Sequence, residues 1–159
     1  MKQAIGILGA IIVLTAAAPI RAVGTAAGTG TGTGGGLDCS GAAASDVIWP
    51  PNHKMVPITI VGMADSVTIQ ITGIQQDEPL LVNGSGQTQP DGDGIGTATA
   101  LVRAERAGPG TGRIYFISFN AMDASGQCSG MVQTYVPHDQ GQGFHPIDTG
   151  ERYDSTGVN

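Results

Sequence analysis

The sequence predicts an all-β fold, a single antiparallel β-sandwich of about seven strands over residues 37–137. Three observations support this prediction. Short runs in which apolar and polar residues alternate recur through this region. Segments rich in Gly, Asp, Asn and Pro separate the runs, as turns would. No window of adequate length after residue 37 has the period of an amphipathic helix.

Five runs carry the strand pattern. They are residues 54–62, 66–74, 96–105, 112–123 and 128–136. In the first run Val56, Ile58 and Ile60 share one face, and Pro57 indicates an edge or partly unpaired strand because it has no amide proton. The residues expected to share a face in later strands are Val67, Ile69 and Ile71, then Tyr115, Ile117, Phe119 and Ala121, and finally Val132 and Val136. A short turn from Asp123 to Gln127 is expected to join the last two strands.

The first 22 residues have the layout of a secretory signal peptide. Lys2 lies near the start, an uncharged apolar stretch follows, and small residues end the segment. We expect cleavage after Ala22, with positions near Ala26 or Ala27 as alternatives. A retained membrane anchor is the other interpretation, because the apolar run is almost long enough to span a bilayer.

Two segments flank the predicted sandwich. Residues 23–36 consist almost entirely of Gly, Thr and Ala and are expected to form a flexible linker. Residues 138–159 are polar and rich in Gly, which predicts a C-terminal extension that is either loose or lies along the sandwich surface.

The chain has two cysteines, Cys39 and Cys128. In an exported protein such a pair predicts a disulfide. Two buried free thiols are the alternative.

The chain is acidic, and loss of Lys2 and Arg21 with a signal peptide would change its formal net charge from −6 to −8. This charge argues against a nucleic-acid partner and against stable insertion into an anionic membrane after cleavage. It suits divalent cations, or simply keeps a secreted protein soluble.

The sequence "WPPNHK" at residues 49–54 contains the only tryptophan. It has two interpretations. In the first it is a structural corner before a strand, in which Trp49 covers the open end of the core and the prolines block pairing between edges. In the second it is an aromatic platform for a sugar or peptide. The candidate ligand contacts are then Trp49, Asn52, His53 and Lys54.

Acidic loops offer a candidate calcium site. Calcium prefers six to eight oxygen ligands, which carboxylates from separate loops can supply. The candidate ligands are Asp77, Glu78, Asp91 and Asp93. In the alternative interpretation these carboxylates cap turns and pair with Arg103, Arg106 and Arg113.

No catalytic motif is present. The sequence has no G-x-S-x-G elbow, no H-E-x-x-H and no His-x-His pair, and both cysteines are expected to be bonded. We therefore predict a non-enzymatic protein with no catalytic residues.

An ordered series of short motifs resembles a known kind of module. The series is "WPPNHK", "QDEP" (76–79), "PDGDG" (90–94), "RAER" (103–106), "GRIYFISFNAMDASG" (112–126) and "VPHDQG" (136–141). It resembles immunoglobulin-like sandwich modules of bacterial secreted and surface proteins, the broad group that includes PKD, HYR and cadherin-like repeats. The residues that match the pattern of the last hairpin are Arg113, Tyr115, Ile117, Asp123 and Gly126. The chain departs from the pattern in having one module, and Gln127 stands where many relatives have Asn.

The resemblance implies a secreted immunoglobulin-like module with a binding, adhesion or structural role at or outside the cell surface, or in a periplasm. Its expected partner is an extracellular protein or glycan. Two alternatives stay open: a calcium-dependent adhesion or matrix protein, and a carbohydrate-binding module centred on Trp49. Calcium is the only cofactor that the sequence suggests.

Overall fold

The computed structural model describes residues 36–141 and 145–157. The expected signal peptide and all but the last residue of the expected linker lie outside this part of the chain. The described residues form strands and loops, with no helix. The strands are β1 (Ala43–Ala44), β2 (Met55–Val61), β3 (Thr68–Gln76), β4 (Gly92–Asp93), β5 (Thr99–Arg103), β6 (Gly112–Asp123), β7 (Gly126–Pro137) and β8 (Tyr153–Asp154).

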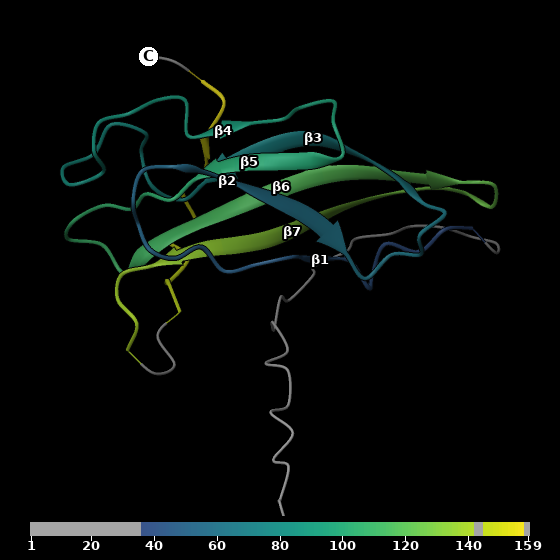
Figure 1. Cartoon of the computed structure of the whole chain (residues 1–159), viewed down its shortest axis with the longest axis horizontal. Coiled ribbons are helices and arrows are strands. Elements are labelled where there is room, and N and C mark those ends of the chain that lie inside the picture. The colour runs from purple at the N-terminus through teal and green to yellow at the C-terminus, as the bar shows by residue number, and fades with distance from the viewer. Residues whose placement is uncertain (1–35, 142–144, 158–159) are drawn as a thin grey trace, which may run out of the picture.

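The strands form two antiparallel sheets of four. One sheet has the order β1-β2-β5-β4 and the other the order β7-β6-β3-β8. The long strands β6 and β7 run side by side along the molecule (Figure 1), and they pair over their full length. The predicted all-β fold with antiparallel sheets is confirmed.

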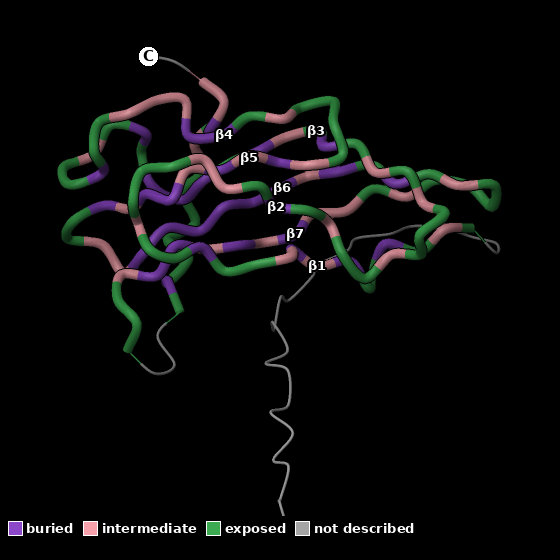
Figure 2. Tube along the Cα trace, in the orientation of Figure 1, coloured by how far each residue is buried: buried purple, intermediate pink, exposed green. Residues whose placement is uncertain are grey.

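One apolar core lies between the sheets. Ile58 and Val102 come to it from the first sheet, and Ile71, Ile117 and Phe119 from the second. Buried residues accordingly alternate with exposed ones in the half of β6 that leads to the turn before β7. Figure 2 colours the chain by this burial. Burial of these side chains, roughly 1.5 to 3 kcal/mol each, is the main force that holds the sheets together.

All five predicted strands are present, with ends within about three residues of the expected positions. On one side of β2, Pro57 pairs in register with Leu101 of β5. On the other side, β1 pairs only with Ile60 and Val61. At Pro57 the strand is therefore paired on one side only, as expected. The turn after β6 is also confirmed, because Asp123 accepts a hydrogen bond from the amide of Ser125 at 2.7 Å.

A bulge in β3 changes which side chains face inward. The register with β6 shifts between Ile71 and Gly73. Thr72 and Gly73 therefore lie together on the outer side, and Ile74 and Gln76 are buried. In a regular strand Gln76 would have pointed outward, so the bulge delivers an amide side chain to the interior.

The C-terminal extension contributes a strand. β8 pairs with β3. Beyond it the carbonyl of Ser155 accepts hydrogen bonds from the amides of Asp91 and Gly92, while the amide of Ser155 donates to Ile74. Residues 153–155 thus connect the two sheets, and this part of the extension is neither loose nor merely laid on the surface.

The predicted disulfide is present between Cys39 and Cys128, with 5.9 Å between the two Cα atoms. Cys128 lies near the start of β7, and Cys39 lies at the beginning of the described chain. The bond closes a loop of 89 residues, which includes most of both sheets.

Candidate functional site

The run at residues 49–54 is largely exposed, and it does not cover the core with its tryptophan. Trp49 is 42% exposed, whereas Ile48 is 1% exposed and belongs to the core cluster. The amide of Ile48 donates to the carbonyl of Tyr135 in β7, which fixes the segment against the second sheet. The corner interpretation therefore assigned the core position to the wrong residue. Ile48 packs into the core, and Trp49 stays at the surface.

The polar candidates of this run divide into two groups. Asn52 and Lys54 are exposed, and the side chain of Asn52 accepts a hydrogen bond from the amide of Lys54. His53 has a left-handed backbone with a φ of 64°, and its amide donates to the carbonyl of Ala104. Its Nδ1 atom lies 3.1 Å from Oε2 of Glu105, a fully buried carboxylate. His53 is thus anchored to the loop after β5, while its ring stays half exposed.

Charged and neutral polar side chains gather in the interior at one end of the sheets. We call this group the buried polar cluster; its members are Gln76, Glu78, Asp91, Arg103, Glu105, Arg113 and Tyr115. Arg113 at its centre is fully buried, which is rare for arginine. Its Nη1 atom lies 2.7 Å from Asp91 and its Nε atom 3.1 Å from Glu78.

Further hydrogen bonds extend the cluster to both sheets. Arg103 of β5 donates from Nε to the other oxygen of Asp91 at 3.2 Å. Tyr115 of β6 donates its hydroxyl proton to the carbonyl of Arg103 at 2.8 Å. Gln76, brought inward by the bulge in β3, donates to Asp91 at 3.0 Å. The carboxylate of Asp91 therefore joins side chains from three strands.

The environment of the cluster shifts two ionisation equilibria. Burial raises the pKa of the Tyr115 hydroxyl, and the neighbouring Arg113 offsets only part of this rise. Burial alone would lower the pKa of Arg113, but its contacts with Tyr115, Asp91 and Glu78 outweigh burial and raise it. Both residues therefore keep the protonated state in which they donate hydrogen bonds.

The four candidate calcium ligands do not converge on a shared site. Asp77, Glu78 and Asp91 are buried, and each accepts hydrogen bonds from protein groups. Asp93 is exposed and accepts from the amide of Gly94. In the described part of the chain no group of three or more His, Cys, Asp or Glu residues is arranged to hold a metal ion.

The alternative interpretation of the acidic loops agrees better with the contacts. Glu78 and Asp91 pair with Arg113, and Asp91 also pairs with Arg103. Arg106 differs, because its guanidinium donates to the backbone carbonyls of Ala107 and His138. Two of the three expected arginine partners are thus confirmed.

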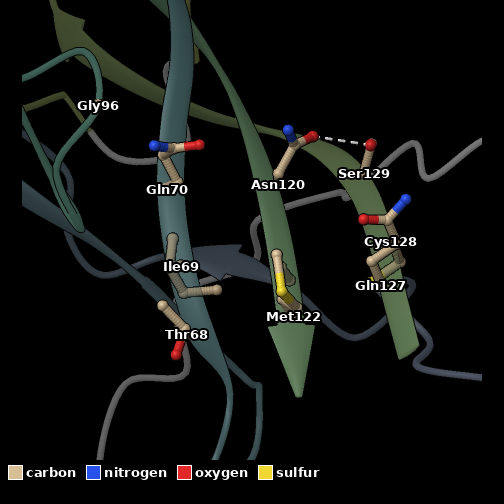
Figure 3. A pocket seen from close by; sticks show the side chains of 10 residues that line it. Thr68, Ile69, Gln70, Gly96, Asn120, Met122, Gln127, Cys128 and Ser129 are labelled. Carbon is tan, nitrogen blue, oxygen red and sulfur yellow. Dashed lines mark hydrogen bonds between the residues drawn. The ribbon is translucent and has the colours of Figure 1, made fainter. Parts of the chain in front are cut away.

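A pocket of about 300 Å³ lies at the second sheet. Exposed residues of the outer side of the sheet line it, together with Gly96 and the inward-facing Ile69, Ala121 and Cys128. Figure 3 shows the side chains that line it from β3, β6 and β7, and six of these form two rows. The rows are Gln70, Asn120 and Ser129, and Thr68, Met122 and Gln127. We call these six residues the amide face. The amide face was not predicted from the sequence. The uncharged residues at the outward positions of all three strands could have indicated it.

Comparisons with protein-family models, with curated proteins and with solved structures give no significant match for this chain. Over the residues that the structure describes, no helix has the length and apolar character needed to cross a membrane.

Proposed function

We propose that this protein is a secreted, non-enzymatic module of the immunoglobulin-like kind that binds, adheres or supports structure at or outside the cell surface. Its partner is an extracellular glycan or protein, and the chain works in an extracellular or periplasmic compartment after removal of residues 1–22.

The observation that carries this proposal is the disulfide between Cys39 and Cys128. Such bonds persist in oxidising compartments and are rare in a reducing cytosol. The bond ties the start of the described chain to β7, an edge strand of the second sheet. Export to an oxidising compartment would keep this bond formed.

The placement of the ionisable residues also favours a role without catalysis. Asp91 and Glu105 are fully buried, and their hydrogen bonds hold Arg113, Arg103 and Thr88 in place. A general acid or base must reach its substrate. These carboxylates are better placed to join the sheets, which leaves the outer surfaces for binding.

The proposal is tested in the organism that produces the chain. Cells are fractionated in the presence of a thiol-reactive maleimide, and the protein is located in each fraction. We expect it outside the cytoplasm, without its first 22 residues and labelled only after reduction. Purified protein should then bind saturably to intact cells or to shed surface material. A reduced protein retained in the cytoplasm would contradict the proposal.

The exposure of Trp49 supports a second candidate, a carbohydrate-binding module centred on that residue. Trp49 is 42% exposed, and Asn52 and Lys54 lie exposed in the same run. Because Ile48 fills the core position, Trp49→Ala should leave the fold intact. Loss of glycan retention by this folded variant would favour the second candidate, and unchanged retention would exclude Trp49 as the contact.

A further inference from the structure

The amide face carries no charged side chain. β3 and β7 contain no charged residue, and of the two in β6, Arg113 is buried and Asp123 lies at the turn. The chain as a whole has a net charge of −6. Solubility favours charge on exposed sheet surfaces, so solubility does not explain this composition.

The polar groups of the amide face are available for a ligand. Gln70 and Gln127 are exposed, and their side-chain amides have no hydrogen-bond partner among the described residues. Asn120 accepts a hydrogen bond from Ser129 at 2.8 Å, an orientation that leaves the NH₂ group of Asn120 free to donate. Each free amide offers both donors and acceptors, as a hydroxyl-rich ligand requires.

The pairing of the strands gives these groups a regular spacing. Gln70, Asn120 and Ser129 are register partners, and Thr68, Met122 and Gln127 form the next row outward. Neighbouring strands lie about 4.8 Å apart, and the two rows lie about 7 Å apart along the strands. β6 pairs with a strand on each side, so the backbone that carries Asn120 and Met122 is held in place. The side chains of the two rows are therefore preorganised for a ligand.

The composition excludes several classes of ligand. A nucleic acid or anionic polysaccharide would need Lys or Arg, and the six residues include neither. A protein partner is disfavoured because the aromatic and Arg residues that dominate such interfaces are missing from the amide face. An uncharged polymer with many hydroxyl groups fits, since the amides can pair with hydroxyls and exposed Met122 can contact the apolar face of a sugar ring.

We propose that the amide face binds a segment of an uncharged polysaccharide, held by hydrogen bonds to Gln70, Asn120 and Gln127. This inference rests on the proposed function as an extracellular binding module, and it names the ligand class and the surface that binds it.

The test is native electrophoresis of the disulfide-bonded protein through gels that contain one polysaccharide each. The neutral probes are hydroxyethylcellulose, xylan, galactomannan, dextran and pullulan, and the anionic probe is polygalacturonate. Mobility is expressed relative to a gel without polysaccharide, which removes the direct effect of a charge change. We expect retardation by at least one neutral polymer and none by polygalacturonate.

Gln70→Glu and Asn120→Asp replace an amide by a carboxylate of nearly the same shape. We expect each to weaken binding at least about fivefold, the equivalent of one lost hydrogen bond. The matched control is Gln140→Glu, which makes the same charge change at an exposed residue after β7. It should bind as the wild type does, and thermal unfolding of all three variants should confirm that they are folded.

Three results would overturn the inference: no retardation by any neutral polymer, retardation by polygalacturonate alone, or equal retardation of wild type and both variants. A dimer in sedimentation analysis that dissociates on Gln70→Glu would instead assign the face to a second copy of the chain. In each case the proposed function is judged separately, by the location and thiol state of the protein in the cell.

Discussion

The guanidinium of Arg113 and the carboxylate of Asp91 lie 2.7 Å apart, and neither side chain is exposed to solvent. Removal of water from two charges is costly, so such a pair adds little net stability when both partners are present. The loss of one partner is different, because the other charge is then buried without compensation. Arg113 and Asp91 should therefore be mutually dependent.

From this dependence we predict that Asp91→Asn lowers the free energy of unfolding by about 3 to 5 kcal/mol. Urea unfolding followed by tryptophan fluorescence measures the change. Asp93→Asn is the matched control, since Asp93 is exposed and lies only two residues away, in β4. Calcium in excess should leave the difference between the two variants unchanged. Equal stability of the variants, or a loss that appears only with calcium present, would contradict the ion-pair explanation and favour a calcium site.

The disulfide leads to a second prediction. Cross-linking over 89 residues restricts the unfolded chain, which on the chain-entropy account stabilises the fold by about 4 to 5 kcal/mol. The double variant Cys39→Ser/Cys128→Ser should lose stability of this order. The wild type in reductant should lose the same amount, and reductant should have no effect on the variant. A variant as stable as the oxidised wild type would show that the bond is dispensable.

The strands that could be predicted from the sequence are those long enough for apolar and polar residues to alternate several times. Residues 112–123 could be assigned because Tyr115, Ile117, Phe119 and Ala121 recur at every second position. β1, β4 and β8 have two residues each, which is too short for any period to appear. Their pairing depends on contacts between distant segments, such as the hydrogen bonds of Ser155 to Asp91 and Gly92.

The buried polar cluster was only partly predictable. Arginine partners for the acidic loops could be expected from composition, and Arg113 and Arg103 do pair with Asp91. That the group lies in the interior could not be expected, because charged residues are usually exposed. Gln76 is the clearest example. It reaches Asp91 only because of the bulge in β3, and the alternation of residues along that strand does not reveal a bulge.

The surroundings of Asp77 give a prediction about pH. Burial raises the pKa of this carboxyl above its ordinary value, although its hydrogen bond from the amide of Ile114 acts in the opposite direction. A carboxyl with a raised folded-state pKa binds its proton more tightly in the fold. Its contribution to stability is therefore fully present below its ordinary pKa and is lost as the pH rises through the folded value.

Asp77→Asn stays neutral and keeps an oxygen that can accept from Ile114. The stability of the variant relative to the wild type should therefore improve as the pH rises from 3 to 7, with the largest change in the region just above the ordinary pKa of Asp. Thermal unfolding of both proteins over this range checks the sign. A relative stability that falls with increasing pH would mean that the ionised carboxylate is favoured by the fold.

The loop that contains Gly86 should be sensitive to its contact with His53. A Cβ atom at Gly86 would lie 2.5 Å from Nδ1 of His53, and the φ of Gly86 is +74°. Gly96 provides the control, because its φ is +84° and no atom lies within 4 Å of its added Cβ. Both alanine variants place a side chain in the left-handed region. Gly86→Ala should be the less stable variant, because it adds the steric contact with His53.

A double-mutant cycle separates that contact from other effects. His53→Ala removes the ring, so Gly86→Ala should cost less in the His53→Ala background than in the wild type, with a coupling of about 0.5 to 3 kcal/mol. The same cycle with Gly96→Ala should give no coupling. Additive costs at Gly86 and His53 would show that the loop moves away from the ring without penalty.

Arg152 should hold the C-terminal strand to the second sheet. Its guanidinium carbon lies 3.6 Å from the centre of the Phe116 ring, and Asp148 pairs with the guanidinium at 2.8 and 2.9 Å. The planar group covers an aromatic side chain that is 1% exposed. Arg152→Ala should therefore lower the free energy of unfolding by about 1 kcal/mol, and it should increase amide hydrogen exchange at Tyr153 and Ser155 before the rest of the fold.

Two further variants assign this effect to stacking or to charge. Arg152→Lys keeps the charge but loses the planar group, and Asp148→Asn removes the ion pair but keeps the stacking. An exposed ion pair contributes little, so Asp148→Asn should change stability less than Arg152→Lys does. If instead Asp148→Asn releases the strand and Arg152→Lys does not, the ion pair and not the contact with Phe116 connects the C-terminal residues to the sheets.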